Sequence, residues 1–213
     1  MTKGFFISGT DTNVGKTIVS SILVNKFDAI YYKPIQCGRN AEGEKDSDIV
    51  RKICKKRTIL DETYFLRNSL SPNIAAKKQG VVIRLNEFIN LDEIKKRKKI
   101  IIEGAGGLQV PINEKYFMTD LIKYYGLPLI LVCRTKLGTI NHSLLSISLL
   151  KKENIQLMGL VFVGKEEKET TKTIQNFGKK IYGKEIKILA NIPQLKVINK
   201  KVINEMQEVF KSI

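Results

Sequence analysis

Residues 9–17 read Gly-Thr-Asp-Thr-Asn-Val-Gly-Lys-Thr and lie between an apolar run, 5–7, and a stretch with a helical pattern, 17–26. A strand, a glycine-bounded turn and a Gly-Lys-Thr sequence that opens a helix form the phosphate-binding P-loop arrangement. Backbone N–H groups and the positive end of the helix dipole then face the phosphates. We therefore expect Lys16 to reach the β- and γ-phosphates of a nucleotide and the Thr17 hydroxyl to bind Mg²⁺.

The glycine spacing departs from the usual G-x-x-x-x-G-K-[ST] pattern. Thr10 occupies the position of the first glycine, and Gly9 comes one residue early. The loop is therefore a variant in which Asp11 and Thr12 bring polar side chains to its rim.

The 213 residues are 43% hydrophobic and 27% charged, which is typical of a soluble globular protein. We expect one domain over residues 1–213, long enough to bury a sizeable core. No apolar run approaches the ~20 residues of a transmembrane helix, and the first strand leaves no room for a signal peptide. Cys37, Cys54 and Cys133 form no C-x-x-C or Cys/His cluster, so we expect no disulfide framework, no zinc site, a cytoplasmic location and no membrane partner.

The formal net charge is +16, from 37 Lys and Arg against 21 Asp and Glu. Such a balance occurs in nucleic-acid-binding proteins, but most lysines here form scattered pairs near the ends of expected helices. The dense run 95–99 precedes an apolar strand, which favours a solvated connection over a nucleic-acid patch. We therefore expect no nucleic-acid partner, and an excess charge that attracts anionic substrates and nucleotides.

Short apolar runs alternate with amphipathic stretches along the chain. The pattern predicts strands at 5–8, 29–33, 99–102, 128–133, 157–163 and 186–190. It predicts helices at 17–26, 47–55, 71–80, 85–96, 117–125, 141–152, 167–182 and 199–211. This alternation implies an α/β protein with a P-loop NTPase-type three-layer fold, a mostly parallel sheet with helices on both faces. In such sheets ligands bind at the carboxyl ends of the strands.

Several acidic and basic residues fall at that edge. Lys33 ends the strand 29–33, where it would meet phosphate or carboxylate, although a lysine leaving a strand is an equal explanation. At the next helix start, Asp46 would cap the helix, whereas Asp48 would either cap it or point to a metal beside the phosphates. Glu103 follows the apolar run 100–102, in the position of the acidic group near Mg²⁺ in P-loop proteins.

Two other segments follow strands. The glycines after Glu103, at 104, 106 and 107, predict a turn whose backbone approaches a ligand. The segment 136–142, Lys-Leu-Gly-Thr-Ile-Asn-His, enters a helix and contains the only histidine. For His142 we favour a structural contact over acid–base chemistry. Cys37 lies where substrate would bind, but no histidine neighbours it in sequence, so we do not interpret it as a nucleophile.

Together these segments resemble the dethiobiotin synthetase family. The matching motifs are Gly-Thr-Asp-Thr-Asn-Val-Gly-Lys-Thr at 9–17, Tyr-Lys-Pro at 32–34, Ser-Asp at 47–48, Ser-Pro at 71–72, Glu-Gly-Ala-Gly-Gly at 103–107 and Lys-Leu-Gly-Thr-Ile-Asn-His at 136–142. The resemblance implies an ATP- and Mg²⁺-dependent reaction of 7,8-diaminononanoate with CO₂. A carbamate is phosphorylated to a mixed anhydride, and ring closure gives dethiobiotin. It also implies a homodimer whose site is completed across the interface.

The resemblance further implies roles for individual residues. Lys16, Lys33 and Thr12 would act on the reacting groups, and Mg²⁺ would be held by Thr17, Asp48 and Glu103. The residues expected to bind ATP are Asn13, Val14, Gly15, Lys16, Thr17, Ile18, Asp48, Glu103, Gly104, Ala105 and Gly106, with Pro193, Gln194 and Leu195 near adenine. Those expected to bind the diamine are Thr12, Lys33, Cys37, Gly106, Gly107 and Asn141.

Two departures from the family pattern carry predictions. Cys37 replaces a small hydroxyl residue, so a strong hydrogen-bond donor is lost. Val163 and Gly164 replace an Asn-Asp pair whose asparagine reads the adenine edge. We therefore predict that backbone near Pro193 holds the base and that nucleotide choice is loose.

Two alternatives stay open. An amide-forming ligase of the cobyrinate-diamide type shares the fold, but such enzymes generally carry a glutamine amidotransferase domain, for which this chain ends too early. A partition- or MinD-like ATPase switch would use the basic surface. Those proteins usually carry a second lysine early in the P-loop, where this chain has Asp11-Thr12-Asn13.

Overall fold

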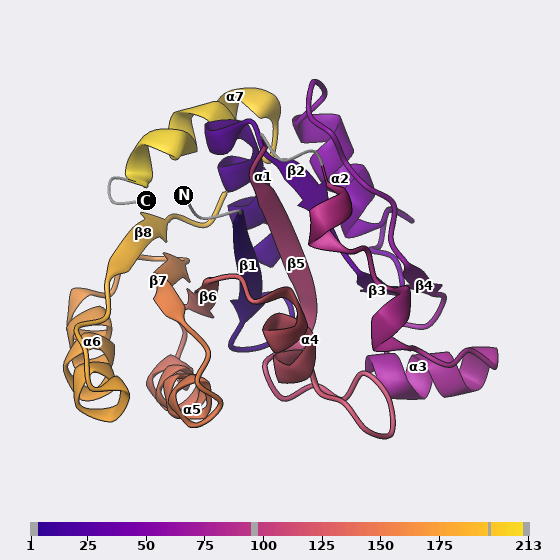
Figure 1. Cartoon of the computed structure of the whole chain (residues 1–213). Helices are drawn as coiled ribbons and strands as arrows, with labels where there is room; N and C mark the ends of the chain where they lie inside the picture. The colour runs from indigo at the N-terminus through magenta and orange to yellow at the C-terminus, as the bar shows by residue number, and fades with distance from the viewer. Residues whose placement is uncertain (1–3, 95–97, 196, 211–213) are drawn as a thin grey trace.

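A computed structural model describes residues 4–94, 98–195 and 197–210. Six strands form its main sheet: β1 (Gly4–Gly9), β2 (Ile30–Tyr32), β5 (Ile100–Gly107), β6 (Leu129–Arg134), β7 (Leu157–Val163) and β8 (Ile188–Ile192). Their order across the sheet is β2-β5-β1-β6-β7-β8, and every neighbouring pair is parallel. The predicted α/β fold is therefore confirmed, with the P-loop strand β1 near the middle of the sheet (Figure 1).

Helices cover both faces of this sheet, which gives the three layers that the sequence predicts (Figure 1). Alternate residues of each strand point to opposite faces, so Phe5 and Ile7 belong to one buried cluster and Phe6 to the other. The first cluster is closed by α1 (Lys16–Phe27), α2 (Asp46–Ile53) and α7 (Lys200–Glu205). The second is closed by α4 (Met118–Tyr125), α5 (Thr139–Lys152) and α6 (Lys168–Tyr182).

Glycines end three helices where the sequence places them. Gly80 follows α3 (Pro72–Gln79), Gly126 follows α4 and Gly183 follows α6, with φ values of 68°, 60° and 80°. A left-handed residue at this position lets backbone N–H groups bond the last carbonyls of the helix. Glycine adopts that conformation without the steric penalty of a Cβ atom.

A second, two-stranded sheet was not predicted. It pairs β3 (Ile35–Cys37) with β4 (Tyr64–Leu66) in parallel and lies beside α3. Each strand has only three residues, too few for an alternating pattern to be recognised. Pro34 separates β3 from β2, so the chain leaves the main sheet and β3 begins directly afterwards.

The predicted helix at 85–96 is wrong. The chain instead forms two 3₁₀ turns, Leu85–Glu87 and Leu91–Glu93, separated by extended backbone at Phe88 and Asn90. The Asn90 side chain accepts a hydrogen bond from the Asp92 N–H, at 3.0 Å, and caps the second turn. Such a local bond competes with a continuous helix. The end of the predicted range, 95–96, lies outside the described residues.

The predicted helix at 199–211 is shorter than expected. Helix α7 ends at Glu205, and a 3₁₀ turn, Met206–Val209, follows it. Residue 211 lies outside the described part of the chain, as do residues 95–97 of the basic run. Within the rest of that run, Lys98 pairs with Asp28 at 3.2 Å, and the Lys99 ammonium lies 4.7 Å from the centre of the Phe27 ring.

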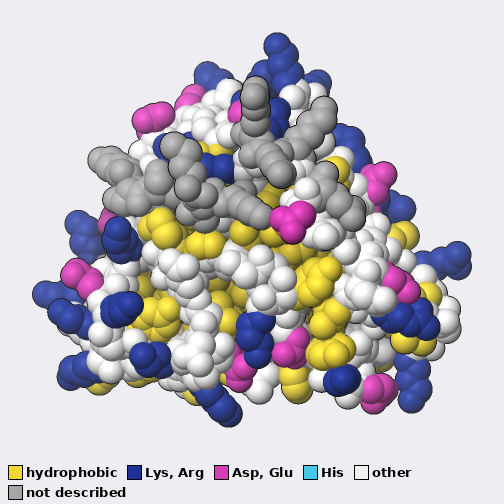
Figure 2. Space-filling model, in the orientation of Figure 1, with side chains coloured by type: hydrophobic (Ala, Val, Ile, Leu, Met, Phe, Trp, Pro, Cys, Tyr) yellow, Lys and Arg dark blue, Asp and Glu magenta, His cyan; other side chains and the backbone are white. Residues whose placement is uncertain are grey.

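Basic side chains are spread over the surface in the view of Figure 2, with hydrophobic side chains exposed between them across the middle of this face. None of the helices in the described residues is long and apolar enough to cross a membrane.

Candidate active site

The P-loop lies where the sequence places it, between the end of β1 and the start of α1. Gly15, the N-cap of α1, has φ 99°, and Asn13 has φ 53°. No side chain caps the helix, so the N–H groups of its first turn are left for another acceptor. A helix start of this kind is an anion-binding site.

Gly9 explains the variant glycine spacing. A Cβ atom at this position would lie 2.5 Å from Val14 Cγ2 and 2.8 Å from the Asp11 carbonyl oxygen. The loop therefore folds back over the last residue of β1, and only glycine fits there. The ammonium of Lys16 donates a hydrogen bond to the same Asp11 carbonyl at 3.0 Å.

Arg134 braces the loop from the neighbouring strand. Its Nη2 atom donates to Asp11 Oδ2 at 2.7 Å and to the Thr12 carbonyl at 2.9 Å. Arg134 was not among the residues expected at the site. Its position as the last residue of β6 was the available signal, because the carboxyl ends of β1 and β6 are adjacent.

Glu103 is the centre of the site. Its carboxylate is 1% exposed and accepts hydrogen bonds on both oxygens. Thr17 Oγ1 lies 2.9 Å and Lys33 Nζ 3.0 Å from Oε1, while the Tyr31 hydroxyl lies 3.0 Å from Oε2. Lys33 Nζ is also 2.6 Å from Asp46 Oδ2. The predicted residues Thr17, Lys33 and Glu103 are therefore brought together.

The charges of this cluster shift its pKa values. Burial alone would lower the pKa of Lys33, but the carboxylates of Glu103 and Asp46 outweigh it and hold the pKa above its usual range. Burial and the neighbouring Lys33 charge lower the pKa of Lys16 to about 8. Burial would raise the pKa of Asp46, but Lys33 and Lys16 lower it overall. Burial, followed by the Glu103 charge, raises the pKa of Tyr31 well above its usual range, so its hydroxyl stays a donor.

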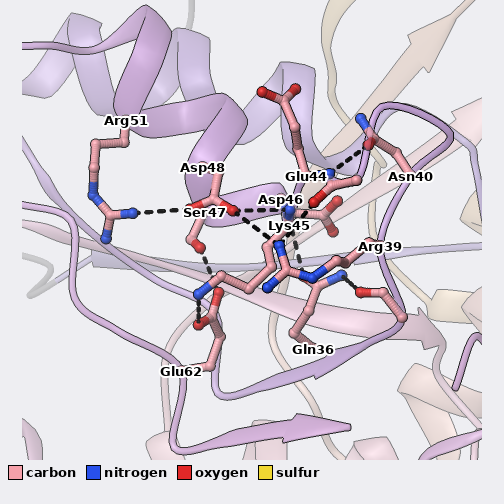
Figure 3. A network of polar contacts seen from close by, with 12 residues as sticks. Gln36, Arg39, Asn40, Glu44, Lys45, Asp46, Ser47, Asp48, Arg51 and Glu62 are labelled. Carbon is pink, nitrogen blue, oxygen red and sulfur yellow. Dashed lines mark hydrogen bonds and ion pairs between the residues drawn. The ribbon is translucent and has the colours of Figure 1, made fainter. Parts of the chain in front are cut away.

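Asp48 caps helix α2, which is one of the two roles left open for it, whereas Asp46 does not cap the helix as expected. Asp48 accepts a hydrogen bond from the Lys45 N–H at 3.0 Å and caps α2, and its other oxygen faces Arg51 at 3.1 Å (Figure 3). Asp46, expected as the cap, instead turns its carboxylate to Lys33. The correction follows from geometry, because a carboxylate three residues beyond the N-cap can reach back to the N-cap N–H. The two Asp48 oxygens bond the Lys45 N–H and Arg51, and the ATP and Mg²⁺ contacts expected of Asp48 stay a prediction.

A buried glutamate fixes the start of α2. Glu62 accepts from Lys45 Nζ at 2.7 Å and from the Ser47 hydroxyl, and its side chain is 3% exposed (Figure 3). Gln36 Oε1 accepts from the Asp46 N–H at 3.3 Å. Together these bonds orient the helix turn that carries Asp46. No sequence signal identified Glu62, because it lies in a loop before β4, far from the recognised motifs.

The glycines after Glu103 stay on β5 and do not form the predicted turn. Ile7 pairs with Glu103 but Gly9 pairs with Gly107, so β5 carries extra residues opposite β1. Such a bulge bends a strand locally. Gly106 has φ 65°, and its Cβ position lies 3.8 Å from Thr12 Cγ2. The P-loop and the end of β5 therefore face each other.

Other expected nucleotide contacts have packing roles. A Cβ atom on Gly104 would lie 3.0 Å from the Phe6 ring, and Val14 is buried in the core. Ala105 and Ile18 are half-buried against the two core clusters. Their backbone atoms are nevertheless part of the loop and strand that border the site.

Val163 lies against the P-loop on the side of β7. Its methyl carbons are 3.0 and 3.1 Å from the Cβ position of Gly15. Val163 pairs with Ile192, and the Gly164 N–H donates to the Ile192 carbonyl at 2.9 Å. The residues expected to bind the base directly follow β8, at the same edge of the sheet. They are Pro193, Gln194 and Leu195.

Three other candidates are Cys37, Asn141 and His142. Cys37, at the end of β3, is half-buried. Burial raises the pKa of its thiol to about 11, although the nearby Lys33 charge acts to lower that pKa. A thiol that stays protonated is a poor nucleophile. Asn141 and His142 are exposed in the first turn of α5.

A phosphate-binding loop and a buried acid on adjacent parallel strands define a P-loop nucleotide-binding protein. In agreement, a family described as an AAA domain matches residues 3–202. The ATP-dependent dethiobiotin synthetase of Lawsonia intracellularis is 39% identical over 206 residues, covering 97% of this chain and 98% of that protein. That of Afipia carboxidovorans is 41% identical over 179 residues, 84% of each chain. The chain belongs to the family of ATP-dependent dethiobiotin synthetases and is therefore a ligase.

Solved structures of other P-loop ATPases share the fold. A ParA family ATPase from Chlorobium tepidum has a TM-score of 0.54 and 12% identity, covering 97% of this chain and 98% of that one. The MinD cell division protein of Aquifex aeolicus has a TM-score of 0.53 and 12% identity, covering 96% and 94%. At this identity the likeness concerns the fold alone.

Replacing Glu62 by Gln should lower the free energy of unfolding by about 3 kcal/mol, because the Lys45 ammonium would lose its buried partner. Asp61→Asn is the matched control, because this carboxylate is 87% exposed and pairs with Arg51 at the surface. We expect its effect to stay below about 1 kcal/mol. Urea unfolding followed by circular dichroism measures both. Equal losses for the two variants would contradict the structural role of Glu62.

Proposed function

We propose that the chain catalyses the ATP-dependent reaction of 7,8-diaminononanoate with CO₂ to form dethiobiotin, ADP and phosphate. The observation that carries the proposal is the convergence of Lys16, Lys33 and Glu103 beside the P-loop. This arrangement supplies two cations for anionic reactants and one acid. The relatives, named ATP-dependent dethiobiotin synthetases, support the same reaction.

The proposed reaction has three steps. One amine of the substrate adds to CO₂ and loses a proton, which gives a carbamate. A carbamate oxygen attacks the γ-phosphorus of ATP, and ADP leaves. The second amine attacks the carbonyl carbon of the resulting mixed anhydride, the ureido ring closes, and phosphate leaves. The oxygen of the carbamate is itself the nucleophile, so the protein supplies position and charge.

Lys33 and Lys16 would neutralise the carbamate and the γ-phosphate. Lys33 stays protonated, because the two carboxylates beside it raise its pKa. The Lys16 ammonium donates a hydrogen bond to the Asp11 carbonyl in the P-loop. When a nucleotide binds, a phosphate oxygen would replace this carbonyl as the acceptor. Thr12 with the backbone of Gly106 and Gly107 would line the diamine site, and Cys37 would lie at its border.

The donor set of the site suits Mg²⁺. In residues 4–94, 98–195 and 197–210, no group of three or more His, Cys, Asp or Glu could hold a metal. Mg²⁺ with a nucleotide needs only one or two carboxylates, with phosphate and water oxygens completing the shell. We propose that Thr17, Glu103 and Asp46 hold it, Asp46 taking the place first expected for Asp48. Bound Mg²⁺ would neutralise charge on the β- and γ-phosphates.

Asp46→Asn and Asp48→Asn test this assignment. The quantity to compare is the Mn²⁺ enhancement, the ratio of the Kd values of a fluorescent ATP analogue without and with Mn²⁺. Because Asp46 faces the cluster, we expect Asp46→Asn to reduce the enhancement at least about tenfold. Asp48→Asn should cost about 1 kcal/mol of stability through the lost cap and leave the enhancement unchanged. The reverse order of the two effects would assign the metal to Asp48.

We also propose a homodimer in which α5 of a second copy completes the diamine site. Leu137, Ile140 and Leu145 expose apolar surface on α5 and the loop before it, next to Asn141. Apolar surface that clusters on one element is typical of an interface. Sedimentation equilibrium would give twice the mass of the chain, and a monomer with full activity would exclude the shared site.

Loose nucleotide choice follows from the apolar residue beside the P-loop. Val163 offers no side-chain amide or hydroxyl to a base edge, and discrimination against a wrong base requires paired polar groups. We therefore expect kcat/KM values for ATP, CTP and GTP within about tenfold of one another, measured by phosphate release. Val163→Asn should shift the ratio toward ATP. A preference for ATP above ~100-fold in the unchanged protein would contradict the prediction.

The function itself is tested by phosphate release from MgATP in bicarbonate buffer with and without 7,8-diaminononanoate. We expect release that depends on the diamine, with one cyclic urea per phosphate by mass spectrometry. Release stimulated by DNA or lipid vesicles, with no response to the diamine, would instead identify an ATPase switch.

A further inference from the structure

We propose that Tyr31 is a positioning residue that fixes the orientation of the Glu103 carboxylate. The inference rests on the proposed function, because it concerns how Glu103 would present an oxygen to the metal. Tyr31 does not touch substrate or nucleotide in this account. It acts only through Glu103, from the side of the carboxylate that faces away from Thr17 and Lys33.

The sheet register brings the two side chains together. Tyr31 on β2 pairs with Ile101 on β5, and residues two apart on a strand share a face. Tyr31 and Lys33 therefore lie on the same face as Ile101 and Glu103, over helix α1. Tyr31 is fully buried, and its hydroxyl donates to Glu103 Oε2 at 3.0 Å.

The two oxygens of Glu103 have separate partners. Oε2 is bound by the phenol, whereas Oε1 accepts from Thr17 and Lys33. Occupation of Oε2 fixes the rotation of the carboxylate about its last bond and leaves Oε1 as the oxygen on the P-loop side. Mg²⁺ tolerates little deviation from octahedral geometry, so the direction of that oxygen matters.

Removal of the hydroxyl should weaken the metal contact without direct loss of a ligand. In Tyr31→Phe, Oε2 would be a buried acceptor with no donor, and the carboxylate would turn to share its remaining donors. Loss of a hydrogen bond that orients a metal-binding carboxylate typically lowers metal affinity by roughly 10–100-fold.

The neighbouring Tyr32 provides a matched control. It lies on the same strand but on the opposite face, where its ring packs edge-on against Tyr125 with centroids 6.4 Å apart. Its hydroxyl bonds with Thr63 Oγ1. Tyr32→Phe removes the same group from the same strand without touching Glu103, so it reports any general effect of a lost buried hydroxyl on β2.

The experiment measures the Mn²⁺ enhancement of ATP-analogue binding for the unchanged protein, Tyr31→Phe and Tyr32→Phe. We expect a decrease of about tenfold or more for Tyr31→Phe, with the Kd of the analogue without metal unchanged. Tyr32→Phe should keep the full enhancement. Replacing Tyr31 by 4-aminophenylalanine, whose amine can donate to Oε2, should restore the enhancement to within about threefold.

An enhancement for Tyr31→Phe within twofold of the unchanged protein would overturn the inference. So would an equal decrease in Tyr32→Phe, or a failure of 4-aminophenylalanine to rescue binding while the thermal midpoint is retained. Diamine-dependent urea formation by the unchanged protein is recorded in parallel. If that reaction occurs and Tyr31→Phe behaves normally, only the role of Tyr31 fails; if it does not occur, the proposed function fails.

Discussion

The burial of the Lys33 ammonium is the constraint on which the site depends. A charge removed from water is stable only when it is paired and hydrogen-bonded, and Lys33 is 3% exposed. Glu103 and Asp46 supply the two carboxylates, so the end of β2, the middle of β5 and the first turn of α2 must meet at one point. Removing either acid would leave an incompletely paired charge inside the protein.

The rest of the fold positions the elements that meet at this point. The parallel sheet brings the carboxyl ends of β1, β2 and β5 to one edge, and the bulge on β5 places Gly106 opposite Thr12. Arg134 holds the P-loop from β6, and Glu62 holds α2 from the loop before β4. At this edge Thr17 and Lys33 donate hydrogen bonds to Glu103, and Lys16 lies close enough for the Glu103 charge to act on it.

Long apolar patterns and glycine signals made most of the fold predictable. The strand at 157–163 and the helix ends at Gly80, Gly126 and Gly183 agree with the structure. Short elements were missed, because β3 and β4 contain three residues each. The predicted helix at 85–96 failed where Asn90 bonds its own backbone, a local competition that apolar spacing does not reveal.

The site was predictable where motifs lie at the ends of strands. Thr17, Lys33 and Glu103 meet as expected. The order of Asp46 and Asp48 was not predictable, because both lie in the first turn of α2 and only the bond from the Lys45 N–H to Asp48 decides which one caps the helix. Glu62, Tyr31 and Arg134 belong to no motif, and their contacts span between 15 and 123 positions of sequence.

The most direct measurement is a crystal structure with Mn²⁺ and a non-hydrolysable ATP analogue, with the metal located by its anomalous scattering. We expect a peak within coordination distance, about 2.0–2.3 Å, of Thr17 Oγ1 and of carboxylate oxygens from Glu103 and Asp46. Lys33 Nζ should then face the γ-phosphate. A peak bound to Asp48, or one with Glu103 outside its coordination shell, would contradict the assignment of the metal to Thr17, Glu103 and Asp46.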